Sequence, residues 1–175
     1  MAILGIDDFK SKLTGGGARS TLYKATINYP SFVGGDVELT SFLIKASSGL
    51  PASNLEELPV PFRGRILKMA GNKAFDDWTT TIINDTDFRI RNDLEKWSNA
   101  INEHSANTGL TNTNDYFADM VIEQLDRDGS VLKKYDFRGC WPKTIAAIAV
   151  GYESEAIEEF ECTWAVQYWE SDTTS

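Results

Sequence analysis

The stretch that decides the fold of this chain is FDDWTTTIIND, which runs from Phe75 to Asp85. Its second half, Trp78–Asn84, is dense in β-branched residues, which favour an extended strand. In the next segment, about residues 87–103, apolar side chains recur at spacings of four, three and four, which predicts one long amphipathic helix. The apolar positions of this helix are Ile90, Leu94, Trp97 and Ile101. A strand followed by a single long helix thus forms the centre of the predicted fold.

The segments on both sides of this centre have the pattern of strands separated by turns. The alternation of Phe160, Cys162 and Trp164 with polar or small residues gives the last strand one apolar face. Gly71-Asn72 is predicted to be a turn. We therefore predict a mainly β fold, an antiparallel β-barrel or sandwich of about seven or eight strands with one flanking helix. Besides 78–84, the expected strands are 22–30, 37–44, 63–69, 116–125, 131–137, 144–152 and 159–169.

The chain has the length of one ordinary domain, 175 residues. Residues 5–13 have the pattern of a helical turn or two, and three consecutive glycines, Gly15–Gly17, predict a hinge. We expect residues 1–20 to be a flexible N-terminal segment and residues 21–175 to form the domain. Asp7 and Asp8 interrupt the apolar core that a signal peptide needs, and no apolar run approaches the ~20 residues of a membrane span. The expected site of synthesis is therefore intracellular, without a membrane partner.

The charge balance argues against tight binding of nucleic acid. Seventeen Lys and Arg residues face 26 Asp and Glu residues, a net charge of −9. A protein that grips DNA needs the opposite excess, because cationic side chains displace counterions from the phosphates. An acidic surface is compatible with nucleic acid that passes without sticking.

No group of residues has the composition of a catalytic or metal site. Asp76 and Asp77 would point to opposite faces of an extended chain, so a catalytic dyad is disfavoured; an ion contact and a structural turn stay open. The single His104 follows the helix, where a cation is stabilised without further function. Cys140 and Cys162 have no CxxC spacing and are predicted to be core thiols. We expect no enzyme activity, no cofactor and no metal.

The region around the opening stretch resembles a known family. The segment PFRGRILKMAGNKAFDDWTTTIINDTD, Pro61–Asp87, is similar to the core signature of the tail tube proteins of contractile-tailed bacteriophages (myoviruses). Similar family motifs are the loop KASSGLPA at 45–52, the turn FRGCWP at 137–142 and the final strand at 160–170. The resemblance covers most of the chain after Leu22 but neither the first twenty residues nor the loop Asn102–Asn114.

The resemblance implies a β-barrel with a flanking helix that assembles into hexameric rings, which stack into a hollow tube. It implies that DNA passes through the lumen without specific binding, that a contractile sheath surrounds the tube, and that a tape-measure protein fills it during assembly. It also implies assembly in the host cytoplasm, a place in the virion tail, and contact with baseplate tube-initiator proteins. A tube initiator, a type VI secretion tube protein, which shares this architecture, and a monomeric β-barrel binding module remain alternatives.

Such a subunit needs surfaces for its neighbours, and the segment Ser47–Pro61 is suited to that role. Its prolines exclude a central strand and leave an extended loop or an edge hairpin, and its apolar side chains would be costly in water. The alternative is that the segment folds back over its own barrel. We further expect neighbouring strands to continue one sheet around the lumen, with acidic residues facing the channel. The candidate interface or rim residues are Leu50, Pro51, Leu55, Leu58, Phe62, Phe75, Asp76 and Asp77.

Overall fold

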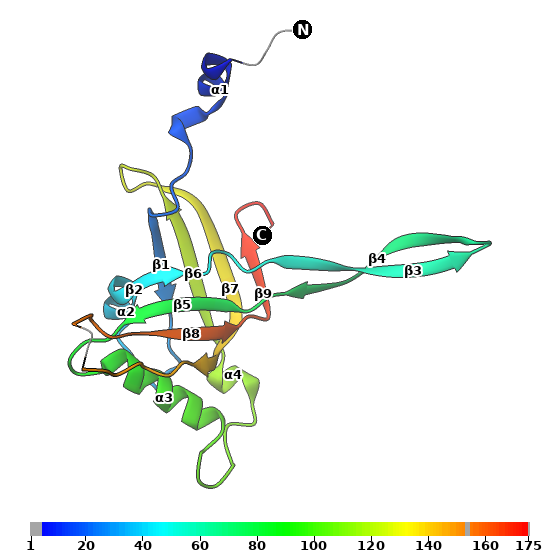
Figure 1. Ribbon diagram of the computed structural model, residues 1–175. Helices are drawn as coiled ribbons and strands as arrows, with labels where there is room; N and C mark the ends of the chain where they lie inside the picture. Colours follow the sequence, from blue (N-terminus) through cyan, green and yellow to red (C-terminus); the bar gives the residue numbers. More distant parts are fainter. Residues whose placement is uncertain (1–4, 153–154, 175) are drawn as a thin grey trace.

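Two antiparallel sheets that share one strand form the body of the protein, seen in a computed structural model that describes residues 5–152 and 155–174 (Figure 1). The first sheet contains β1 (Tyr23–Ile27), β6 (Ala118–Leu125), the first part of β7 (Val131–Ile145) and β9 (Tyr168–Ser171). The second contains the end of β7, β8 (Glu159–Ala165), β5 (Trp78–Ile83) and β2 (Ile44–Ser47). The predicted mainly β fold is confirmed, as a sandwich and not a closed barrel.

Strand β7 bends at Gly139 and so passes from one sheet to the other. Its residues up to Cys140 pair with β6, and its residues from Trp141 pair with β8. Gly139 has a φ of 62°, and a Cβ at this position would lie 2.8 Å from the side chain of Gln167. The predicted break between strands 131–137 and 144–152 is therefore a bend within one strand. The predicted strand is wrong beyond Ile145, where β7 ends.

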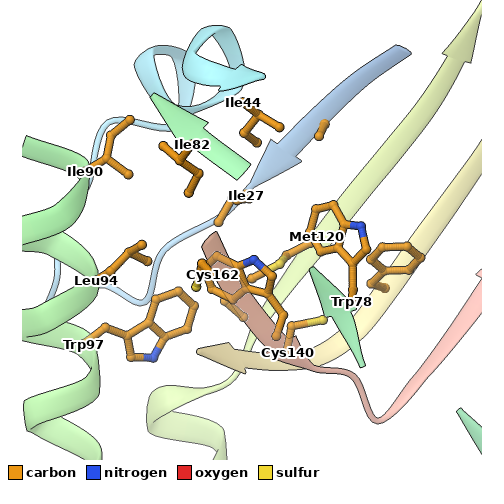
Figure 2. Close-up of a cluster of buried hydrophobic side chains, with 14 of the residues drawn as sticks. Ile27, Ile44, Trp78, Ile82, Ile90, Leu94, Trp97, Met120, Cys140 and Cys162 are labelled. Carbon is orange, nitrogen blue, oxygen red and sulfur yellow. The ribbon is translucent and has the colours of Figure 1, made fainter. Parts of the chain in front are cut away.

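The two sheets and a helix enclose an aromatic core (Figure 2). Trp78 and Trp164 are opposite each other on β5 and β8, and both are fully buried. Helix α3 (Arg89–Ile101) covers one open side of the sandwich, as the spacing of four, three and four predicts. It buries Ile90, Leu94 and Trp97, and the Trp97 ring lies 5.7 Å from that of Trp164.

One predicted strand is mostly helix. Residues Val37–Leu43 form α2, and only Ile44 begins a strand. The Asp36 side chain accepts a hydrogen bond from the backbone N–H of Leu39 at 3.0 Å, which caps the helix. Thr40 is buried, with its Oγ1 2.8 Å from the Tyr29 hydroxyl. The sequence prediction of a strand was wrong because it gave weight to the apolar content of this segment and none to the Asp cap.

Short helices lie outside the sandwich. The N-terminal helix α1 (Ile6–Lys12) and the 3₁₀ turn η1 (Thr14–Gly16) extend away from β1, and α1 has no buried residue. Helix α4 (Thr113–Tyr116) precedes β6. The division at residue 20 stays a prediction. Within residues 5–152 and 155–174, no helix has the length and apolar content to cross a membrane.

Candidate subunit interface

The most prominent feature of the molecule is a hairpin that extends away from the sandwich (Figure 1). Its strands β3 (Ser53–Phe62) and β4 (Arg65–Phe75) are joined by a turn at Arg63-Gly64, where φ is 46° and 80°. Of the two options for Ser47–Pro61, the edge hairpin is the one observed, and the segment does not fold back over the body. Gly71-Asn72 lies inside β4 and not in a turn, and these two residues form a bulge opposite the single residue Glu56 of β3.

One face of the hairpin is apolar and open to solvent. Leu58 is opposite Met69, Val60 is opposite Leu67, and Phe62 follows on the same face. Their exposed fractions run from 38% for Val60 to 67% for Phe62. A lone two-stranded hairpin is marginally stable in water, and a row of large apolar side chains is costly when hydrated. We call these five side chains the hairpin apolar face.

The hairpin has a charge opposite to that of the body. Its residues 53–75 contain four Lys and Arg and two Glu, a net charge of +2 in a chain of net −9. The remaining residues therefore carry −11. Lys68 forms an ion pair with Glu57 at 2.9 Å, whereas Arg63 and Arg65 at the tip form no ion pair with any described residue. The hairpin tip thus carries two exposed, unpaired arginines on a protein that is otherwise acidic.

An aromatic contact fixes the root of the hairpin to the body. The Phe75 and Trp169 rings meet edge to face at 6.0 Å, and Trp169 also contacts Tyr135 at 5.7 Å. The Trp169 Nε1–H donates to the Pro51 carbonyl at 3.0 Å. Pro51 is buried and Phe75 half-buried. These two predicted interface residues therefore pack inside their own subunit, where they support the hairpin on β9.

The two adjacent carboxylates of the opening stretch have separate partners. Asp76 accepts a hydrogen bond from the Asn54 side chain at 2.9 Å, while its backbone N–H donates to the Ala52 carbonyl at 3.0 Å. Asp77 forms an ion pair of 2.6 Å with Lys143 on β7. They share no proton or substrate position, in agreement with the prediction for an extended chain. Asp76 connects the two strands of the hairpin at its root, and Asp77 connects the root to the second sheet.

The other predicted interface residues lie in the open. Leu50 is 42% exposed, Leu55 65%, Leu58 54% and Phe62 67%. Sequence reasoning missed Leu67 and Met69, because residues 63–69 were assigned to a strand of the body. The prolines of the preceding segment, Ser47–Pro61, could have indicated this hairpin. A proline-containing extended segment is excluded from the centre of a sheet, and residues 63–69 follow it directly as a possible hairpin partner.

The candidate metal-ligating and nucleophilic side chains of the described residues do not form a site. In the part of the chain that the structure describes, no three His, Cys, Asp or Glu residues lie close enough to hold a metal ion. His104 is exposed beyond the end of α3. Cys140 and Cys162 are free thiols without exposed surface, which confirms their prediction as core residues.

Both thiols should be silent toward thiol reagents until the protein unfolds. Burial raises the pKa of Cys140 to about 12 and raises that of Cys162 further above its usual range. At pH 8 we expect Ellman's reagent to label neither thiol in the folded state and both in 6 M guanidinium. The unfolded thiols ionise near pH ~8.5, so the contribution of the two thiols to folding stability should be constant below that pH and should be lost as the pH rises from there toward 12. Rapid labelling of the folded protein at pH 8 would contradict this account.

Comparisons with known proteins identify the family of this chain. The family model described as phage tail tube protein matches residues 14–172. The tail tube protein gp19 of Enterobacteria phage T6 is 32% identical over 87% of this chain and 91% of its own length. The tail tube protein of Serratia phage KSP90 is 28% identical over 90% of this chain and 91% of its own length.

A solved structure shares the fold at low identity. It is the sheath–tube complex of an extracellular contractile injection system, PVC, in the extended state, with a TM-score of 0.66 and 14% identity over 93% of this chain and 96% of that chain. The family match covers nearly the whole chain. The chain belongs to the family of phage tail tube proteins, which are structural components of the virion and not enzymes.

Proposed function

We propose that this chain is the building block of a tail tube, in which six copies close a ring and the rings stack around a channel for DNA. Family membership supports the class of protein, and the hairpin apolar face is the observation that carries the assembly. A contractile sheath outside the tube is part of the proposal, supported by the shared fold with a tube from a sheath–tube complex. A tape-measure protein and baseplate tube initiators are the further proposed partners.

The hairpin suits a head-to-tail contact between copies. It protrudes from one end of the second sheet and offers a surface that its own subunit does not cover. A contact between two different patches forms a closed ring when the rotation between neighbouring copies closes after a whole number of subunits. Otherwise the same contact forms an open helical filament. One such contact around the axis and another along it build a tube.

The outer face of the second sheet is suited to line the channel. It presents hydroxyl groups of Thr79, Thr81 and Thr163, which alternate with buried core residues. Its cations are neutralised, since Lys45 pairs with Glu159 at 2.6 Å and Lys143 with Asp77. Glu161 adds one carboxylate that forms no ion pair within the described residues. Two lysines against three carboxylates give a slightly acidic surface, on which phosphates find no free cation.

Reversing the charge of Glu161 should impede DNA passage without preventing assembly. Glu161→Lys would place a ring of six free cations in the channel, and each cation near the DNA adds electrostatic attraction. We expect tubes of normal length, and a phage titre per assembled tail lowered at least tenfold. Glu161→Gln is the matched control and should retain most of the titre. Equal titres for the Lys and Gln variants would contradict the proposal that this face lines the channel.

The two root carboxylates should matter more for assembly than for folding. In Asp76→Ala with Asp77→Ala, we expect a loss of ~1 kcal/mol or less in the free energy of unfolding, because both pairs are at the surface. The hairpin should lose its fixed direction, so the critical concentration for tube formation should rise severalfold. Lys143→Ala alone should give a smaller rise. Wild-type assembly of the double variant would mean that these acids have no such role.

Electron microscopy of the purified protein tests the proposal and separates it from its alternatives. The tube subunit should form long tubes, alone or on added baseplates. One ring per baseplate would indicate a tube initiator instead. A protein that remains monomeric at all concentrations, with and without baseplates, would overturn the proposed assembly.

A further inference from the structure

The N-terminal helix has an apolar face that the described residues leave open to solvent. Helix α1 places Ile6 and Phe9 on one side, with Leu13 one turn further, because residues three and four positions apart share a face of a helix. Their exposed fractions are 68%, 61% and 43%. The helix has no buried residue and stands away from the sandwich (Figure 1). This face therefore has the character of a docking surface whose counterpart lies elsewhere.

An apolar groove lies close to the point where this segment joins the body. The groove has a volume of about 630 Å³ and runs between β1 and α2. Its wall includes Phe42, which is 79% exposed, and Leu125 at the end of β6. Val37 and Tyr23 add further apolar surface. We call this the β1–α2 groove, and it offers apolar contacts that the body of the protein leaves unused.

A short glycine hinge connects α1 to the edge of this groove. The Gln124 side-chain amide donates to the carbonyls of Arg19 and Leu22 at 2.5 and 2.7 Å, so Arg19 is held beside Leu22, whose neighbour Tyr23 lines the groove. Before Arg19, the glycines 15–17 all have φ between 66° and 80°, which glycine adopts without steric cost. The tether formed by residues 13–18 spans at most ~20 Å. Helix α1 can turn about this hinge, and the short tether keeps it near its own groove.

The charges at the edge of the groove complement those of α1. Lys24 and Glu38 line the groove and form no ion pair within the described residues. On α1, Asp7 and Lys10 form only a weak pair of 3.9 Å between highly exposed side chains, and Lys12 has no ion pair within the same residues. A helix docked through its apolar face thus brings charges of both signs to a rim that carries one free charge of each sign.

We infer that, in the free subunit, α1 folds back about the glycine hinge and docks its apolar face in the β1–α2 groove of the same chain. The extended arrangement of Figure 1 is then the form that enters a tube, because docking hides both the α1 face and Phe42 from neighbouring copies. Helix α1 is thus a latch that covers apolar surface until assembly. The docking stands by itself, whereas the release on assembly rests on the proposed function.

A designed disulfide tests the docked state in the monomer. Lys10→Cys combined with Glu38→Cys places one thiol beside the apolar face of α1 and one at the groove, while the native Cys140 and Cys162 stay buried. In a dilute sample that sedimentation velocity shows to be monomeric, mild oxidation should close an intramolecular disulfide. This reaction should be at least tenfold faster than in Ser11→Cys with Glu38→Cys, whose helix thiol lies on the opposite face. Equal rates, or a disulfide between two chains, would overturn the docking within one chain.

The oxidised chain then tests the release on assembly. With α1 locked in the groove, the Lys10→Cys, Glu38→Cys chain should form no tubes, and added reductant should restore assembly to within about threefold of the wild type. Tubes from the oxidised chain at the level of the reduced chain would overturn the release step. A wild type that forms no tubes under any condition would instead reject the proposed function, and the disulfide rates in the monomer would still decide whether α1 docks.

Discussion

Leu58→Asp combined with Leu67→Asp is expected to abolish tube formation while leaving the subunit folded. Both side chains belong to the hairpin apolar face, at 54% and 60% exposure. Full burial of a leucine stabilises an association by ~1.5–3 kcal/mol, and about half of that is still to be gained at these exposures. Two buried carboxylates would add a desolvation penalty. A loss of ~3 kcal/mol or more at each contact lowers the association constant more than about a hundredfold.

The folded state should tolerate this double substitution. Among the residues that the structure describes, Phe75 at the hairpin root packs against Trp169 of the body, and neither leucine belongs to the core cluster. We expect a circular dichroism spectrum and unfolding midpoint close to the wild type, with a monomer in sedimentation velocity at concentrations where the wild type forms tubes. Lys68→Gln, on the opposite face, is the control and should assemble normally. Normal tubes from the double Asp variant would show that this face has no neighbour.

Trp164→Ala is expected to cause the largest loss of stability, about 3–5 kcal/mol in the free energy of unfolding. Trp164 has no exposed surface, and its ring contacts Trp97 at 5.7 Å and Trp78 at 6.5 Å. Its Nε1–H also donates to the buried Thr80 hydroxyl at 3.0 Å, so truncation removes a hydrogen bond and opens a cavity. For a domain whose total stability is ~5–15 kcal/mol, this loss leaves a substantial unfolded fraction.

The stability measurement has to be made on a monomer, because assembly stabilises the folded state by mass action. The Leu58→Asp, Leu67→Asp background supplies that monomer, and urea unfolding followed by tryptophan fluorescence gives the difference. Tyr168→Ala is the matched control, since this aromatic side chain is 45% exposed, and it should cost ~1 kcal/mol or less. A cost below ~1 kcal/mol for Trp164→Ala would contradict the packing of the core.

Local pattern was sufficient for the elements whose burial is periodic. The spacing of Ile90, Leu94 and Trp97 predicted α3, and the β-branched residues of Trp78–Asn84 predicted β5; each of these elements has one face in the core. The pattern failed at Val37–Leu43, where a capped helix leaves Phe42 in solvent. The pattern also failed at Gly139, where a break between two strands was predicted and β7 continues through a bend. A glycine marks a bend within a strand and the end of a strand equally well.

The interface was harder to predict because it depends on contacts far apart in the sequence. The prolines of Ser47–Pro61 excluded a central strand, but the pairing of β3 with β4 is a property of the folded chain. The opening stretch shows the same limit. Phe75, Asp76 and Asp77 were expected at a rim, yet the residues that define their role are Trp169, Asn54 and Lys143. Only the tertiary structure brings these partners to the hairpin root.

The most direct test of the account is a cryo-electron microscopy reconstruction of tubes assembled from the wild-type chain. We predict rings of six subunits in which the hairpin apolar face of each copy is buried against a neighbouring copy. Hairpins that project into solvent would contradict this prediction.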